Sequence, residues 1–177
     1  MHPHLEEITS YLARVRADLA SVIGETPATT FDRQPRSGGW SGTGIIHHLG
    51  KVEGSTAKLL EALFAKALSD GVGPDPGTPS WMHSLDHFRV VDRSRRLLAP
   101  DRVAPDPAAG LPASWASLQA VRPRLLRAVA TVDGRDLTTV SAPHPFLGPL
   151  NGYEWVLFIG QHEERHLSQL RETLSAA

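Results

Sequence analysis

Cysteine is absent from this 177-residue sequence. This absence excludes disulfide bonds, zinc sites built on thiolates and nucleophilic thiols supplied by the chain itself. An excess of charge is also missing, because 18 Lys and Arg residues face 19 Asp and Glu residues, for a net charge of −1. We therefore expect no nucleic-acid partner and no anionic membrane surface as a partner, since both select a marked excess of positive charge.

Long apolar runs are missing as well. The longest fall far short of the roughly 20 residues that a membrane-spanning helix needs. Residues 1–7 lack the basic start followed by an apolar stretch that marks a signal peptide. We therefore expect a cytoplasmic protein. With 41% hydrophobic and 21% charged residues, the chain has the composition of one globular domain spanning residues 1–177.

Apolar residues recur at steps of three and four along most of the chain, which predicts helices. The expected helices cover residues 5–23, a stretch that starts at Trp40-Ser41 and carries its apolar stripe to Leu63, and residues 80–98, 114–132 and 155–170. Pro123 is expected to kink or interrupt the fourth of these. His2 and His4 are expected to be disordered, being close to a chain end. No alternating stretch is long enough to predict a sheet. The pattern predicts an all-α protein, an antiparallel up-down-type four-helix bundle with an extra short helix and long Pro/Gly-rich loops.

The last expected helix contains two histidines four residues apart, His162 and His166. Residues at this spacing lie on one face of a helix, so a single metal ion can contact both. Both histidines continue the apolar stripe of Ile159 and Leu170, which predicts that they face the bundle interior. An inward imidazole is costly unless it finds a hydrogen-bond or metal partner.

A third histidine is available on the second helix, where His47 and His48 are adjacent. Neighbouring helical residues point about 100° apart, so one of the two faces inward. His48 lies among Ile45, Leu49 and Val52, and helical periodicity therefore selects His48. The alternative is a core histidine bonded to a backbone carbonyl. An inward pair that needs a partner favours coordination.

The segment 162–166 also reads HExxH, the zinc peptidase string in which the glutamate is the general base. Such enzymes take a third ligand from downstream of this helix. Eleven residues follow His166, and their sole carboxylate is Glu172, with no glycine to turn the chain. The peptidase interpretation is therefore disfavoured, and Glu163 is expected to be solvated or at the bundle edge.

Two separated motifs resemble those of the DinB-like superfamily. Trp40-Ser41 followed by residues 45–49 (IIHHL) resembles its WS…HL segment. Residues 144–150 (HPFLGPL), 153–155 (YEW) and 162–170 (HEERHLSQL) resemble its C-terminal signature. The resemblance runs in order over residues 40–170.

The resemblance implies a four-helix bundle with one divalent metal ion held by three histidines. Carried over to this sequence, the ligands are His48, His162 and His166. Zinc or nickel would be typical, and three protein ligands leave a coordination position open. Relatives include metal-dependent transferases and isomerases that use low-molecular-weight thiols, so the implied partners are such a thiol and a small electrophilic substrate. A homodimer is also implied.

Three functions remain open at the level of the sequence. The first is a metal-dependent enzyme, a thiol-dependent S-transferase or a hydrolase-like enzyme. The second is a non-catalytic, metal-stabilised stress-response or binding protein, and the third is the disfavoured HExxH metallopeptidase. The sequence identifies no convincing catalytic residue beyond the ligands.

Four further residues are candidates for contacts with a substrate or with the metal ligands. His83 and His87 form another pair four residues apart, whose alternative is two exposed histidines on a short helix. His144 precedes the last helix and could instead have a role in its loop. Glu53 lies five residues after His48. Separately, the cluster of Arg93, Arg95 and Arg96 would bind a phosphate or carboxylate if it faced the site, and would otherwise be solvated.

Overall fold

The computed structural model describes residues 1–35, 38–77, 79–94 and 98–176. The long helices are α1 (Pro3–Glu25), α3 (Gly42–Ser69), α4 (Leu111–Thr131) and α5 (Gly152–Ser175). The short elements are α2 (Ala28–Phe31), η1 (Asp86–Phe88), η2 (Asp101–Val103), β1 (Ser141–His144) and β2 (Gly148–Asn151). Among the described residues, no helix is both long and apolar enough to cross a membrane.

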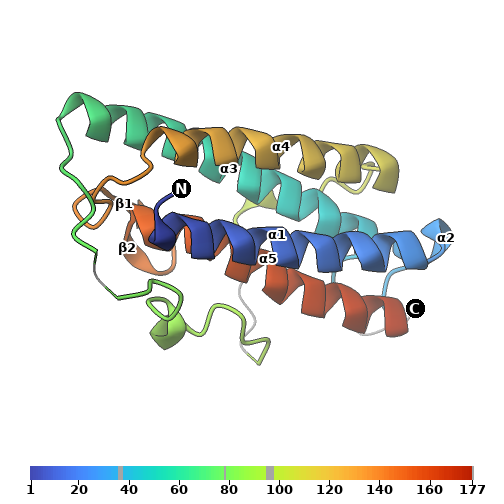
Figure 1. Ribbon diagram of the computed structural model, residues 1–177. Coiled ribbons are helices and arrows are strands. Elements are labelled where there is room, and N and C mark those ends of the chain that lie inside the picture. Colours follow the sequence, from blue (N-terminus) through green and yellow to red (C-terminus); the bar gives the residue numbers. More distant parts are fainter. Residues whose placement is uncertain (36–37, 78, 95–97, 177) are drawn as a thin grey trace.

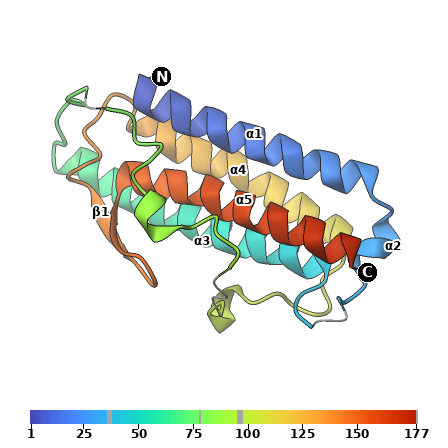
Figure 2. The ribbon, with the colours of Figure 1, turned by 90° about the horizontal axis from the view of Figure 1, so that it is seen from below.

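The long helices pack side by side, which confirms the predicted all-α four-helix bundle (Figure 1, Figure 2). α3 packs along α4 and α5, and α1 packs along α5. The contacts also define the helix directions. Gly50 lies against Leu118 and Gly54 against Val121, so α3 and α4 are parallel neighbours. The order is therefore up, down, down, up and not the predicted up-down alternation, because the long connection after α3 returns the chain to the end of the bundle where α3 began.

α1 and α5 approach each other closely at Gly160. A Cβ atom on this residue would lie 2.5 Å from Cε1 of Tyr11, well inside van der Waals contact. α5 is buried along most of its first half, where every residue from Trp155 to Gln161 is buried. This close packing on several sides makes α5 the central helix on which the candidate site is built.

Local sequence signals account for the start of the two helices that carry the candidate site. Ser41 caps α3, as predicted, and its side chain accepts a hydrogen bond from the Gly44 amide at 3.2 Å. Asn151 and Glu154 form a reciprocal capping box at the start of α5. These caps fix the registers from which the histidines project.

The segment predicted as a helix over residues 80–98 is not one in the described part. It contains turns and the short helix η1, and Arg89 then takes a left-handed conformation with φ of 53°. Residues 95–97 lie outside the described residues. Leu85 is fully buried, and partly buried apolar side chains such as Trp81 and Phe88 also pack against the core, which holds the segment to the bundle without a continuous helical face. The Arg165 guanidinium donates to the carbonyl oxygens of Val90 and Asp92, which satisfies backbone groups that a helix would have paired internally.

Two further elements differ from the sequence-based expectations. β1 and β2 form an antiparallel hairpin that was not predicted, because its four-residue strands place Pro143 opposite Pro149 and are too short to show alternation. Pro123 neither breaks nor ends α4, which continues to Thr131. The hairpin is tied to α5 by the indole of Trp155, which donates to the Ala142 carbonyl at 3.1 Å.

A candidate three-histidine metal site

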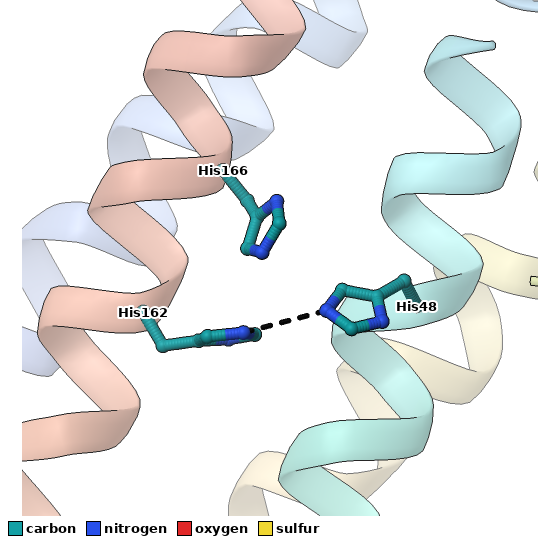
Figure 3. A group of neighbouring side chains, drawn as sticks. All are labelled: His48, His162 and His166. Atoms are coloured by element: carbon teal, nitrogen blue, oxygen red, sulfur yellow. Dashed lines mark hydrogen bonds between the residues drawn. The ribbon is translucent and has the colours of Figure 1, made fainter. Parts of the chain in front are cut away.

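His48 from α3 and His162 and His166 from α5 converge between the two helices (Figure 3). One ring nitrogen from each residue lies within 4.8 Å of the other two. The Nε2 atoms of His48 and His162 are 3.4 Å apart. Two nitrogens bound at roughly 2.0–2.1 Å to a tetrahedral zinc ion would be about 3.4 Å apart. The spacing of the imidazoles thus fits a shared small cation.

Hydrogen bonds orient two of the three rings. Nδ1 of His48 lies 2.8 Å from the carbonyl oxygen of Val103, and Nδ1 of His166 lies 2.8 Å from Oε1 of Gln169. A carbonyl oxygen can only accept, so in both rings Nδ1 donates its proton and Nε2 keeps a free lone pair. Fixing a ligand in this way is typical of metal-binding histidines. Val103 itself is held in place because Lys51 donates to the Ala104 carbonyl at 2.7 Å.

The environment keeps these imidazoles neutral, the state in which they can ligate a metal. His48 and His166 are buried, and burial lowers the pKa of both. The pKa of His166 falls to about 3, through burial and then the neighbouring charge of His48. Burial also lowers the pKa of His162, with further contributions from His166 and His48.

Aromatic side chains surround the three rings. Trp40 packs against His48, with 4.7 Å between ring centroids, and stacks on His166 at 6.3 Å. Phe158 packs against His162 at 5.3 Å. These rings limit the rotation of the imidazoles and give the site apolar walls.

His144 from the hairpin lies next to this aromatic wall. Its ring is 4.5 Å from that of Phe158 and 5.2 Å from that of Trp155, measured between centroids. Its Nδ1 accepts the backbone amides of Phe146 and Leu147, both at 3.2 Å, so His144 has the role in its loop that was left open from the sequence. Burial, followed by the charge of Arg102, lowers the pKa of His144 to about 4. Its ring is therefore neutral at physiological pH.

The other candidate contact residues are elsewhere. The Glu53 carboxylate is buried and is paired with Arg16 at 2.6 Å and with Arg122 at 2.5 Å. His83 and His87 are both exposed, and Nδ1 of His83 lies 3.0 Å from a carboxylate oxygen of Asp86. None of these three side chains is part of the three-histidine cluster.

Glu163 was expected to be solvated or at the bundle edge, and this expectation is wrong. The side chain is 1% exposed and is held by the guanidinium groups of Arg16 and Arg122. The physical reason is the central position of α5, which buries the face beside the histidines as well. Together with Glu53, these residues form a buried network of two acids and two arginines, which we call the Arg–Glu network.

Sequence reasoning missed the residues that support the site: Trp40, Val103, Gln169, Arg16 and Arg122. Arg122 carried a signal, because it occupies an inward position between Leu118 and Leu125 on an apolar stripe. The role of Val103 depends on its backbone carbonyl and gave none, whereas Gln169 acts through its side-chain amide three residues after His166 on the same helix. Of the arginine cluster considered from the sequence, Arg93 pairs with Glu172 at 2.7 Å, and Arg95 and Arg96 lie outside the described residues.

Comparisons with known proteins agree with this architecture. The sequence model of the DinB superfamily matches residues 11–170. Protein YuaE of Bacillus subtilis (strain 168), described as uncharacterized, is 29% identical over 144 residues, which cover 80% of this chain and 81% of YuaE. The crystal structure of TT2238, a four-helix bundle protein, aligns with a TM-score of 0.64 at 24% identity, covering 94% of this chain and 98% of TT2238. The structural match supports the fold alone.

Proposed function

Since this chain belongs to the DinB superfamily, we propose that it binds one divalent metal ion, zinc or nickel, through His48, His162 and His166. The observation that carries the proposal is the convergence of three imidazole nitrogens within 4.8 Å. The fixed Nδ1–H bonds of His48 and His166 support it further, since they leave Nε2 of each ring free to ligate. Imidazole ligands suit both metals, and the donor set does not select one of them.

We further propose that the metal site is catalytic and transfers a low-molecular-weight thiol to a small electrophile, with a hydrolase-like reaction as the variant in which water replaces the thiol. A divalent ion with three protein ligands has a position open and lowers the pKa of a thiol or water there. The rings of Trp40 and Phe158 pack against the histidines and would offer apolar contact to the electrophile.

Two buried acids close in sequence to the ligands are not available as general bases. Glu53 and Glu163 each accept from both arginines of the Arg–Glu network. This pairing also argues against a peptidase, which would need Glu163 free to activate water. His144 is left as a positioning residue, because its ring packs on Phe158, which in turn packs on His162.

The alternative is a metal-stabilised protein without catalysis. It is favoured by one observation: the histidines join α3 to α5, so a shared ion would add a cross-link between two helices of the bundle. Metal binding then contributes directly to folding free energy.

A thiol-consumption assay separates the two functions. The protein is loaded with zinc or nickel and mixed with the electrophile 1-chloro-2,4-dinitrobenzene. Separate reactions contain cysteine, glutathione or another small thiol. Catalysis predicts thiol consumption that stops on chelation and in His48→Ala, but persists in His83→Ala. If no thiol is consumed and chelation only lowers the melting temperature, the non-catalytic alternative holds.

A further inference from the structure

A further group of metal-ligating side chains lies where α1 begins: His2, His4 and Asp75. One nitrogen or oxygen from each lies within 4.8 Å of the other two. Nδ1 of His4 is 2.9 Å from Oδ2 of Asp75, and Nδ1 of His2 is 3.2 Å from the same oxygen. The expectation that His2 and His4 are disordered is therefore wrong, and His4 is in fact 6% exposed.

Several backbone contacts fix this group. His2 is the N-cap residue of α1, and its amide donates to a carboxylate oxygen of Asp133 at 2.6 Å. Asp75 lies in the connection that follows α3, and its amide donates to the Gly134 carbonyl at 2.9 Å. The Gly77 amide donates to Oδ1 of Asp75 at 2.8 Å. The three side chains thus come from two segments that are each anchored to the bundle.

Tyr153, in the first turn of α5, completes the surroundings. Its hydroxyl donates to Oδ2 of Asp75 and its ring packs edge-on against His4, with 5.6 Å between centroids. The Asp75 side chain is only 2% exposed, so its charge is held in a largely desolvated position. A buried carboxylate in contact with two imidazoles requires a proton or a cation to balance it.

Hydrogen bonds account for the contacts of Asp75 with His4, Tyr153 and Gly77, but not for the position of His2. Nδ1 of His2 is shielded from solvent and makes no hydrogen bond to any described residue, despite lying 3.2 Å from Asp75. Tyr153, His2 and His4 all converge on one carboxylate oxygen. Ligand atoms at roughly 2.0–2.1 Å from a tetrahedral zinc ion are about 3.4 Å apart. The 3.2 Å between Nδ1 of His2 and Oδ2 of Asp75 is close to this edge length, and the 2.9 Å between Nδ1 of His4 and the same oxygen is a hydrogen-bond distance.

We propose that His2, His4 and Asp75 form a second metal site, structural in role, that takes zinc or a similar transition-metal ion. Two imidazoles and one carboxylate suit such ions better than magnesium or calcium, which prefer oxygen ligands. The ion would join the start of α1 to the connection after α3 and, through Tyr153, to the start of α5.

This site is separate from the three-histidine cluster. Tyr153 and His162 are nine residues apart on α5, which is about 13 Å along the helix. The two clusters share no residue. The second site therefore does not depend on the proposed function.

The test is made in a background of His48→Ala combined with His162→Ala, which removes the first cluster. Protein without an N-terminal tag is titrated with zinc against a chromophoric chelator. The background variant is expected to bind one zinc per chain and to melt at a higher temperature with zinc than without. Adding Asp75→Asn, which keeps the shape of the side chain, should weaken zinc binding by at least tenfold. Adding His2→Ala, a substitution at a partly exposed position, should have an effect of the same size.

Asp86→Asn is the matched control, because Asp86 forms an exposed pair with His83 at 3.0 Å. In the same background it should leave zinc affinity unchanged. The proposal is overturned if the background variant binds no zinc, or if Asp75→Asn and His2→Ala bind it as tightly as Asp86→Asn. The proposed function is tested separately in His2→Ala, in which His48, His162 and His166 are intact. This variant should bind one zinc ion per chain, and its failure to do so would count against the three-histidine site alone.

Discussion

Nε2 of His48 lies 3.4 Å from Nε2 of His162, although 114 positions separate the two residues in the sequence. The contact forms because α3 and α5 run antiparallel, so an early turn of one helix meets the middle of the other. His166 adds a third nitrogen one helical turn further along α5. This relationship between two helices carries the proposed metal site.

Gln169→Leu should weaken zinc binding by about 10- to 100-fold, because supporting groups of metal ligands typically have effects of that size. The amide oxygen of Gln169 accepts the Nδ1 proton of His166 at 2.8 Å, and its loss frees that ring to rotate. Competition titration against a chelator measures the change. Ser168→Ala, the neighbouring substitution, serves as control, and equal affinities for the two variants would contradict the orienting role.

Arg122→Ala should lower the free energy of unfolding by roughly 3–5 kcal/mol, the usual cost of removing one partner from a buried ion pair. It leaves the carboxylates of Glu53 and Glu163 buried with one guanidinium fewer. Urea unfolding provides the measurement. Arg124→Ala is the control, since Arg124 also joins α4 to a glutamate of α3, Glu61, but in an exposed pair. A loss no larger than that of Arg124→Ala would show that the network does not stabilise the bundle.

Gly160→Ala should cost roughly 1–3 kcal/mol of stability, as expected for an overpacked core. The new methyl group would sit 2.5 Å from Tyr11 and force α1 and α5 apart. Gly54→Ala provides the contrast, because its Cβ would lie 3.7 Å from Val121 in ordinary contact. That change should be neutral or stabilising, by up to about 1 kcal/mol of helix propensity. Thermal unfolding of both variants decides, and similar melting temperatures would refute the close approach.

The metal-free protein should lose stability as the pH falls from 7.5 to 5. Burial lowers the pKa of His166 to about 3, whereas an unfolded chain has a histidine pKa near 6.5. Between these pH values the unfolded state binds a proton that the folded state does not bind. The free energy of unfolding therefore rises with pH through this window, and the contribution of His166 is fully present above about pH 6.5. Urea unfolding at several pH values should show a shallower slope for His166→Gln than for the exposed-site control His87→Gln. Identical slopes would contradict the assignment to His166.

The fold and the site differ in how much of each the sequence could predict. Periodicity selects His48 over His47, and the structure has His48 3% exposed and turned toward α5. Local patterns of this kind also gave the long helices and the Ser41 cap. They failed where tertiary contacts decide. Glu163 is buried because α5 is packed on several sides, and His4 is ordered because Asp75 and Tyr153 hold it.

Tertiary contacts also explain the two segments that sequence analysis mispredicted. The segment after residue 80 has apolar residues at helical spacing, yet its backbone groups are satisfied by Arg165, far along the chain. The hairpin before α5 contains Pro143 and Pro149, and because proline is rare in strands, the sequence does not predict its strands. Both depend on partners that no local window of sequence contains.

The most direct measurement is the metal content of three untagged proteins that all carry Asp75→Asn, which removes the second metal site. One keeps both His47 and His48, one adds His47→Ala and one adds His48→Ala. The assay then reports the three-histidine site alone. Elemental analysis after equilibration with zinc should find close to one ion per chain in the protein with His47 and His48 intact and in His47→Ala. His48→Ala should retain well below one. Near-stoichiometric zinc in His48→Ala would contradict the central claim.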